Sequence, residues 1–364
     1  MSHLQDGVPV AAGLDELPDD PFPGGEADDT LRLARAVLER YPVADGRCGL
    51  PGVLARSGRC DLELGGSAVD TDVPRLRAGR VGAQFWALDL PEGTGGDRAL
   101  AATLELLDLA RAVIAAHPEG LRPARSAGEV IDARNCGRTA VVLGPAGARA
   151  LADSLPALRA LHTLGLRVLT LSGTAWAGGK TGLTRFGEEV VREMNRLGVL
   201  ADVSGAPEST AHRVLALSRT PVLCTRSAAS ALRPHPDNVS DDLLGALGAA
   251  GGLCMVPFAA EQCGTAVEDV ADHLGHVRDV AGPESVGLSG AYDTGAAHPA
   301  ELDNPSRHPH LVAELLRRGW SDTELSLLTW GNVQRALRSA DFTARAAQDR
   351  GEPSRARLAD LDGG

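Results

Sequence analysis

Histidines in the C-terminal third of this chain are the residue types best suited to bind a metal, because neutral imidazole is the commonest nitrogen ligand. His273 and His276 are three residues apart on a predicted helix, so both lie on one helix face. His298, His308 and His310 fall in an expected loop. The helical pair faces away from the strand ends, where barrel enzymes carry out their chemistry, so we expect structural roles for it. A metal role for the loop histidines is the less favoured interpretation.

Cysteines offer a second kind of chemistry, nucleophilic or redox. The chain contains no C-x-x-C pair, and several cysteines fall in predicted apolar strands, which favours reduced thiols in a cytosolic protein. A cysteine nucleophile needs an adjacent base, and no histidine is placed to serve Cys48 or Cys224. The six cysteines are Cys48, Cys60, Cys136, Cys224, Cys254 and Cys263.

Composition limits the classes of partner. With 364 residues and 43% hydrophobic content, the chain is able to bury the core of one large barrel or of two ordinary domains. A net charge of -12 argues against binding to nucleic acid or to an anionic membrane surface. The sequence shows neither a secretion signal nor an apolar run long enough to span a membrane. We therefore expect a cytoplasmic protein.

The elements that must position these side chains are well illustrated by residues 182–205. Apolar residues recur at helical spacing up to Leu197, Gly198 stops the helix, and Val199–Val203 predicts a buried strand. Barrel enzymes hold their catalytic residues at the carboxyl end of such a strand. Gly205 lies there and contributes no reactive group.

The same alternation runs through the chain and predicts a closed parallel (β/α)8 TIM barrel. Ser126–Glu129 and Thr265–Glu268 have capping-box spacing, and residues 97–117, 309–318 and 321–340 are predicted helices. The eight predicted strands are the one that begins at Val43, Val81–Leu88, Thr139–Gly144, Arg167–Leu171, Val199–Val203, Pro221–Cys224, Gly252–Pro257 and Ser285–Ser289.

Three regions are expected from the composition along the chain. Residues 1–27 are rich in Asp, Glu, Pro and Gly and predict a disordered acidic tail. Residues 28–342 would form the barrel, and the charged residues 343–364 predict a loose C-terminal tail.

Several segments, in the same order along the chain, resemble the renal (membrane) dipeptidase family, and the resemblance covers roughly Leu31 to Leu337. It implies a TIM barrel of the metallo-dependent-hydrolase type, in which two bridged zinc ions and a carboxylate hydrolyse dipeptides. The matching segments are Asp72–Arg77, Gly82–Trp86, Leu169–Leu171 with Trp176 and Ala177, Gly182–Ser204, Asn238–Asp242 and Arg318–Ser321.

The metal ligands that this resemblance implies are absent from the sequence. The His-x-Asp motif of the first strand falls on Arg47 and Gly49, and the bridging glutamate falls on Ala146. The two later histidines fall on Gly205 and Arg226. The flanking motifs fix the register at each position, so we predict that no zinc binds and that no other cofactor is required.

The residues implied to handle the substrate are absent as well. The polarising histidine falls on Gly173, the arginine that holds the substrate carboxylate falls on Asp237, and the catalytic aspartate falls on Ala291. The resemblance therefore predicts the family fold without the family's catalytic groups.

By analogy with the family, Arg47 and Arg226 project into the former metal chamber. One interpretation is that the two guanidinium groups replace the charge of the metals and bind a small anion. The favoured alternative is that each fills space and pairs with Asp202, Asp237 or Asp293.

Trp176 and Tyr292 correspond to pocket walls, and Asp293 belongs to the same loop as Tyr292. Arg47, Arg226, Trp176, Tyr292 and Asp293 are thus the candidate ligand-binding residues. Asp202 and Asp293 match supporting acids of the family, which we expect to persist as acceptors that orient loops.

The leading hypothesis is a catalytically inactive pseudo-dipeptidase that serves as a scaffold, as a partner subunit or as a small-anion binder. It would form a homodimer, or a hetero-oligomer with an active dipeptidase relative. The alternative is an enzyme: an active dipeptidase with unrecognised ligands, or a metal-free enzyme at the same barrel mouth around Arg47, Arg226 and Cys48.

Overall fold

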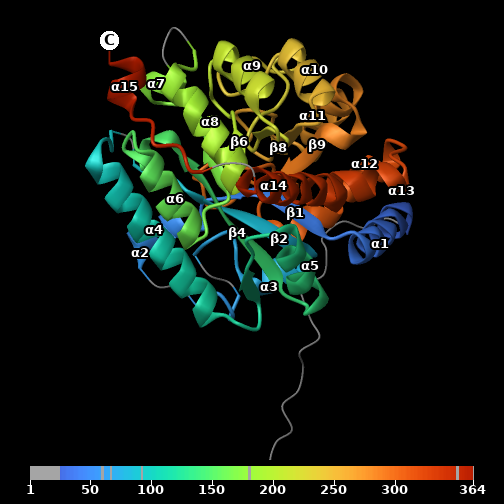
Figure 1. Ribbon diagram of the computed structural model, residues 1–364. Coiled ribbons are helices and arrows are strands. Elements are labelled where there is room, and N and C mark those ends of the chain that lie inside the picture. The colour runs from blue at the N-terminus through green and yellow to red at the C-terminus, as the bar shows by residue number, and fades with distance from the viewer. Residues whose placement is uncertain are drawn as a thin grey trace, which may run out of the picture.

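The computed structural model describes residues 25–58, 61–65, 68–91, 93–178, 182–349 and 352–363. The expected acidic tail lies outside these residues, except for positions 25–27, which begin the first helix. Figure 1 shows helices arranged around a central group of strands, with α4 and α6 on one side and α1, α12 and α13 on the other.

The strands are parallel and close into a barrel. β1, β2, β4, β5, β6, β7, β8 and β9 pair in that order, and β9 pairs back onto β1. The closed TIM barrel predicted from the sequence is confirmed. The strand bounds are β1 Val43–Cys48, β2 Val81–Leu88, β3 Leu121–Pro123, β4 Thr139–Gly147, β5 Val168–Thr170, β6 Leu200–Asp202, β7 Leu223–Cys224, β8 Leu253–Pro257 and β9 Val286–Ser289.

One strand was not predicted. β3 is three residues long and pairs with the first residues of β4, outside the ring of eight. Its sequence, Leu-Arg-Pro, carries too short an apolar pattern to indicate a strand, and proline is tolerated because this is an edge strand.

Fifteen α-helices lie in the part of the chain that the structure describes. They are α1 Gly25–Arg40, α2 Leu50–Ser57, α3 Val73–Ala78, α4 Asp97–Ala116, α5 Ala127–Asn135, α6 Leu155–Leu164, α7 Ala175–Gly178, α8 Arg185–Leu197, α9 Glu208–Leu217, α10 Asp241–Ala249, α11 Val267–Ala281, α12 His308–Arg317, α13 Asp322–Ser326, α14 Asn332–Gln348 and α15 Leu358–Asp362. Short 3-10 turns occur at Ala148–Leu151, Pro283–Ser285, Ala300–Leu302 and Pro305–Arg307, and a π-helical turn, Leu327–Gly331, joins α13 to α14. Within the described ranges, no helix has the length and apolar character needed to cross a membrane.

Local capping chemistry sets several helix starts. The Ser126 side chain accepts a hydrogen bond from the Glu129 amide at the start of α5, as the capping-box spacing predicted. The box predicted at Thr265–Glu268 is displaced by one residue, because the Asp269 carboxylate accepts from the Ala266 amide instead. Alanine has no acceptor of its own, so only half of a capping box forms there.

α14 closes the amino-terminal end of the barrel. Its residues Val333 and Leu337 share an apolar cluster with Val168, Leu200 and Leu253, the first residues of β5, β6 and β8. The amino end of the barrel is therefore filled by packing, which leaves the carboxyl-terminal end for any site.

The C-terminal region is more ordered than expected. α14 continues to Gln348, beyond the predicted end of the barrel domain at residue 342. Leu358 and Leu361 then pack against the main core, and the Asp362 carboxylate accepts a hydrogen bond from Thr184 at the start of α8. The sequence prediction of a loose tail missed these contacts because they depend on distant residues rather than on local periodicity.

Candidate functional site

The carboxyl-terminal ends of the strands, here called the barrel mouth, carry the positions at which the family ligands would lie. Arg47 lies in β1 and Ala146 near the end of β4, while Gly49, Gly205 and Arg226 lie in the loops that follow β1, β6 and β7. Because parallel strands end on one side of the barrel, these five positions belong to the same face.

Asp45 is a fully buried acid of the mouth. Its carboxylate accepts hydrogen bonds from Gln84 at 2.9 Å, from the Gly290 amide at 2.6 Å and from the Arg47 amide at 3.3 Å. Burial raises its pKa to about 6, against the opposing effect of these hydrogen bonds. Asp45 thus ties β1 to β2 and to the loop after β9, and both of its carboxylate oxygens accept hydrogen bonds.

Both arginines of the mouth are paired with carboxylates. The Arg47 Nη2 atom donates to both carboxylate oxygens of Asp89, at 2.5 and 2.7 Å. Arg226 forms an ion pair with Asp237 at 3.2 Å. The pairing of Arg226 follows the favoured interpretation of the sequence, whereas the partner of Arg47 is Asp89 rather than one of the three acids expected. Asp89 directly follows β2, and β2 was expected beside β1, so the sequence could have indicated Asp89 as a partner of Arg47.

Gly49 cannot accommodate a side chain without a shift of the backbone. A Cβ atom at this position would lie 2.4 Å from the carbonyl oxygen of Asp293 and 3.1 Å from the Thr294 Cα atom. The Gly49 amide also donates to the Tyr292 carbonyl at 2.8 Å. The loop after β9 therefore occupies the space that a ligand carboxylate would need.

That loop is held by Asp293. Its carboxylate accepts hydrogen bonds from the amides of Asp70 at 2.8 Å and Thr71 at 3.1 Å, and burial raises its pKa. The backbone takes positive φ at Ala291 (54°) and Asp293 (59°), a conformation that costs free energy in residues other than glycine. Asp293 acts as the loop-orienting acceptor predicted from the sequence, on amides that the sequence analysis did not identify.

Tyr292 fills the mouth from the same loop. Its side chain is fully buried, and its ring lies 5.1 Å from that of His298, 6.0 Å from that of His308 and 6.2 Å from that of Phe258. Burial raises the tyrosine pKa well above its usual value. The residue expected at a pocket wall is part of a packed aromatic cluster.

The opposite side of the mouth is formed by small residues. Ala146 is fully buried within β4, and the Arg149 Nε atom donates to the Gly173 carbonyl at 3.0 Å. Gly205 has a φ of 67°, and a Cβ atom there would meet only a side-chain oxygen of Asp237, at 3.1 Å. Fewer backbone atoms crowd these positions than crowd Gly49.

Asp202 organises this second side. Its Oδ1 atom accepts from the Ser204 hydroxyl at 2.7 Å and from the Thr225 amide at 2.8 Å, and its Oδ2 atom accepts from the Thr170 hydroxyl at 2.6 Å. The predicted role as an acceptor that orients loops agrees with these contacts.

The remaining candidate residues are also held in hydrogen bonds or buried packing. Trp176 donates to Asp153 at 2.7 Å and packs edge-on against Phe186. Cys48 and Cys224 are fully buried, and burial raises both thiol pKa values well above the ordinary range. Neither thiol is poised as a nucleophile, because the thiolate is the reactive form.

Of the three histidines expected in a loop, His298 lies in one, whereas His308 and His310 belong to α12, because that helix already begins at His308. His298 and His308 hydrogen-bond through Nδ1 to the carbonyls of Phe258 and Pro305, at 2.8 and 2.6 Å. Burial lowers the pKa of His308 to about 4, so this ring is neutral at physiological pH. Each ring is oriented by its carbonyl partner.

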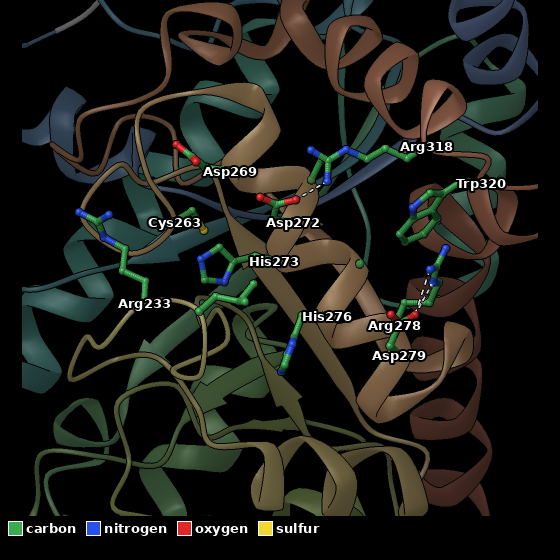
Figure 2. A pocket seen from close by; sticks show the side chains of 13 residues that line it. Arg233, Cys263, Asp269, Asp272, His273, His276, Arg278, Asp279, Arg318 and Trp320 are labelled. Carbon is green, nitrogen blue, oxygen red and sulfur yellow. Dashed lines mark hydrogen bonds and ion pairs between the residues drawn. The ribbon is translucent and has the colours of Figure 1, made fainter.

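The helical histidines lie in a cleft on the outer surface of α11, which Figure 2 shows from close by. His273 Nδ1 accepts from the Ala229 amide at 3.1 Å, and His276 Nε2 lies 2.7 Å from Asp241. These are the structural roles expected from the sequence.

The side chains present do not fit a zinc pair. Zinc binds thiolate, imidazole and carboxylate, whereas the five family positions hold two arginines, two glycines and one alanine. A guanidinium has no acceptor to offer a metal. Among the residues that the structure describes, no group of three or more His, Cys, Asp or Glu side chains is arranged to hold a metal ion. Metal-assisted hydrolysis lacks its ligands at this mouth.

Comparison with known proteins identifies the family. The sequence model of the family described as membrane dipeptidase (peptidase family M19) matches residues 31–351. Dipeptidase 3 of Macaca fascicularis is 38% identical over 335 residues, which cover 86% of this chain and 68% of that protein. Dipeptidase verJ of Clonostachys rogersoniana is 32% identical over 354 residues, 89% of this chain and 91% of that protein.

The fold agrees with solved structures. The probable dipeptidase PvdM of Pseudomonas aeruginosa superimposes with a TM-score of 0.78 at 19% identity, covering 87% of this chain and all of that one. At this identity the likeness concerns the fold alone. The family match and the sequence identity carry the assignment: the chain belongs to the membrane dipeptidase family.

Proposed function

We propose that this chain is a catalytically inactive pseudo-dipeptidase whose barrel serves as a scaffold or partner subunit. One observation carries the proposal: Gly49, at a family ligand position, is closed by the Asp293 carbonyl 2.4 Å from where its Cβ atom would lie. Substitution alone would leave the place of the ligand side chain open, whereas here the protein's own backbone lies where that side chain would begin.

The charges at the mouth support the same proposal. The Nη2 atoms of Arg47 and Arg226 are engaged by Asp89 and Asp237, so a substrate carboxylate would have to compete with these two acids. The relatives are named dipeptidases, and an active dipeptidase with unrecognised ligands is the competing function. It would need a donor set that the described residues do not bring together.

A metal-free enzyme is the less supported version of the competing function. It would rely on Cys48 beside Arg47, but burial keeps that thiol protonated, and Asp293 rather than a histidine lies next to it. Thiolate formation there would add a second negative charge beside a buried carboxylate, which is unfavourable.

The ligand class that we propose for the mouth is a small anion. The Nε atoms of Arg47 and Arg226 are buried and have no hydrogen-bond partner among the described residues. An N–H group of a charged guanidinium favours a carboxylate or phosphate oxygen over any neutral acceptor.

The test combines metal analysis with turnover. We expect purified protein, incubated with excess zinc and then desalted, to retain far less than one zinc per chain and to hydrolyse no member of a dipeptide panel. An active family member treated in the same way is the positive control. Stoichiometric zinc together with dipeptide turnover would overturn the proposal, and turnover without zinc that is lost in Arg47→Ala would establish the metal-free enzyme.

The partner role has a separate test. We propose either a homodimer or a hetero-oligomer with an active dipeptidase relative, in a cytoplasmic setting. Native pull-down from the source cells followed by mass measurement distinguishes the two, because only the hetero-oligomer carries a second dipeptidase chain. A monomer at every concentration tested would exclude both assemblies.

A further inference from the structure

A groove on the side of the barrel, separate from the mouth, is lined by several positively charged side chains. It lies where α4 and α6 end and where β3 begins, and its volume is about 590 Å³. In a (β/α)8 barrel, helices end at the side where the strands begin, so this groove lies toward the end opposite the mouth. We call it the arginine groove and define it by Arg111, Arg122, Arg125 and Arg138 around Leu121.

The charge of the arginine groove is largely unbalanced. Among the described residues that line it there is no Asp or Glu. Arg111 has no hydrogen-bond or ion-pair partner in the described part of the chain, and Arg122 contacts only the Cys136 sulfur, at 3.7 Å. The ion pair of Arg138 with Glu119 is long, at 3.7 Å, and that carboxylate is 78% exposed. Solvent screens such a pair, so it leaves most of the positive field in place.

The surface cleft in Figure 2 shows what a balanced site looks like in the same molecule. There Arg318 bonds to Asp272 and Glu314, and Arg278 bonds to Asp279 at 2.9 Å. That cleft is lined by three arginines and three aspartates, whereas the arginine groove is lined by four arginines and no acid among its described residues. In a chain of net charge -12, four guanidiniums with a single exposed acid among their partners are unusual.

The floor of the arginine groove is apolar. Ile114, Leu121, Val141 and Leu143 contribute to it from α4, β3 and β4, each at most 4% exposed. Sites for small molecules typically span about 300–1,000 Å³ and combine apolar walls with a few polar groups. The space of about 590 Å³ falls in that range and is too small for a folded partner.

We propose that the arginine groove binds a small anionic amphiphile, a single carboxylate or phosphate head on a medium-length aliphatic chain. The head would lie between Arg111, Arg122 and Arg138, and the chain would cover the apolar floor. Arg125 stays engaged with the Thr163 carbonyl, at 2.8 Å, and holds the end of α6. This site is independent of the mouth and of whether the mouth has any activity.

The test is calorimetric titration of the full chain with octanoate and with octyl phosphate. We expect saturable binding of one molecule per chain, and the tighter of the two probes identifies the head group. Acetate, inorganic phosphate and neutral octanol should bind much more weakly, because each lacks one half of the recognition. Equal binding of acetate or inorganic phosphate would overturn the amphiphile proposal in favour of a simple anion.

Two variants of equal charge locate the site. Arg111→Gln combined with Arg122→Gln and Arg138→Gln should weaken binding at least about tenfold, as expected for lost charged hydrogen bonds. Arg35→Gln combined with Arg98→Gln and Arg355→Gln removes three exposed arginines elsewhere and should leave binding unchanged. The single variant Arg111→Gln tests the site without a risk to folding, because the Arg111 side chain has no partner among the described residues. No saturable binding by the parent chain, or equal binding by the two triple variants, would overturn the proposal.

Discussion

The two sides of the barrel mouth differ in what surrounds the positions at which the family ligands were expected. On the β1 and β9 side, the position of Gly49 is crossed by the backbone of Asp293, and buried Tyr292 fills the neighbouring space. On the β4 to β7 side, Ala146 and Gly205 stand at expected ligand positions, and a Cβ atom at Gly205 would meet only the side chain of Asp237. Backbone from the loop after β9 closes the first side, which we call the rebuilt side. The second side has small residues at the expected ligand positions and no such backbone across Gly205.

The difference shows that hydrogen bonds within the protein hold the loops of the mouth in place on both sides. The second side keeps Asp202 as an acceptor for Thr170, Ser204 and Thr225, so the loops there hold their course without a metal. The first side depends on the loop after β9, in which the Asp293 carboxylate accepts a hydrogen bond from the amide of Thr71. Restoring the family residues would therefore meet little resistance on one side and a steric barrier on the other.

The largest expected effect comes from one substitution made on both sides. Gly49→Ala should lower the free energy of unfolding by about 3 kcal/mol, because its Cβ atom meets backbone that cannot move aside. Gly205→Ala should cost only about 1 kcal/mol, the strain of an alanine at positive φ. Urea unfolding of both variants measures the contrast.

Gly205→Asn is the control for this comparison, since asparagine tolerates positive φ and should be close to neutral. Equal costs for the two alanine variants would show that the loop after β9 yields easily and that the first side is as open as the second.

A smaller effect is expected from removing the acceptor that fixes the rebuilt side. Asp293→Ala leaves the amides of Asp70 and Thr71 without their partner and should cost about 2 kcal/mol. Hydrogen exchange should accelerate at those two amides while the Thr225 amide, held by Asp202, keeps its protection. Asp293→Asn retains one acceptor oxygen and should lose less. Uniform acceleration on both sides of the mouth would mean that the two sides are not independent.

Much of the fold could be predicted from local patterns in the sequence. Apolar runs such as Val81–Leu88 predicted the eight barrel strands, and the motifs around them placed the expected ligand positions at the ends of those strands. The partner of Arg226 was among those predicted as well. These features depend on periodicity and on spacing along the chain, which a sequence displays directly.

What the sequence did not reveal depends on contacts between distant segments. The closure of Gly49 results from the positive φ of Asp293, a non-glycine residue for which sequence predicts an ordinary backbone. The pairing of Arg47 with Asp89 requires knowing that β1 and β2 end side by side. The packing of α15 against the core depends likewise on residues far away along the chain.

The smallest expected effect concerns pH and again belongs to the rebuilt side, where Asp45 and Asp293 are buried near one another. Burial raises the pKa of Asp45 from 3.8 to about 6, so the folded protein binds this proton more tightly than the unfolded chain does. Its contribution to stability is therefore fully present below pH 3.8 and is lost as the pH rises through 6. Between pH 7 and pH 5 the folded state should gain about 1 kcal/mol from this group.

Other groups titrate over the same range, and His308, with a pKa lowered to about 4, works in the opposite direction as the pH falls. The measurement is therefore a difference: the free energy of unfolding of the parent chain minus that of Asp45→Asn, at pH 7 and at pH 5. The two proteins share every other titrating group, so the change in this difference with pH isolates Asp45, whatever the variant costs in absolute terms. A difference that stays constant with pH would mean that Asp45 is ionised throughout and that the rebuilt side tolerates a buried charge, as a former metal site would.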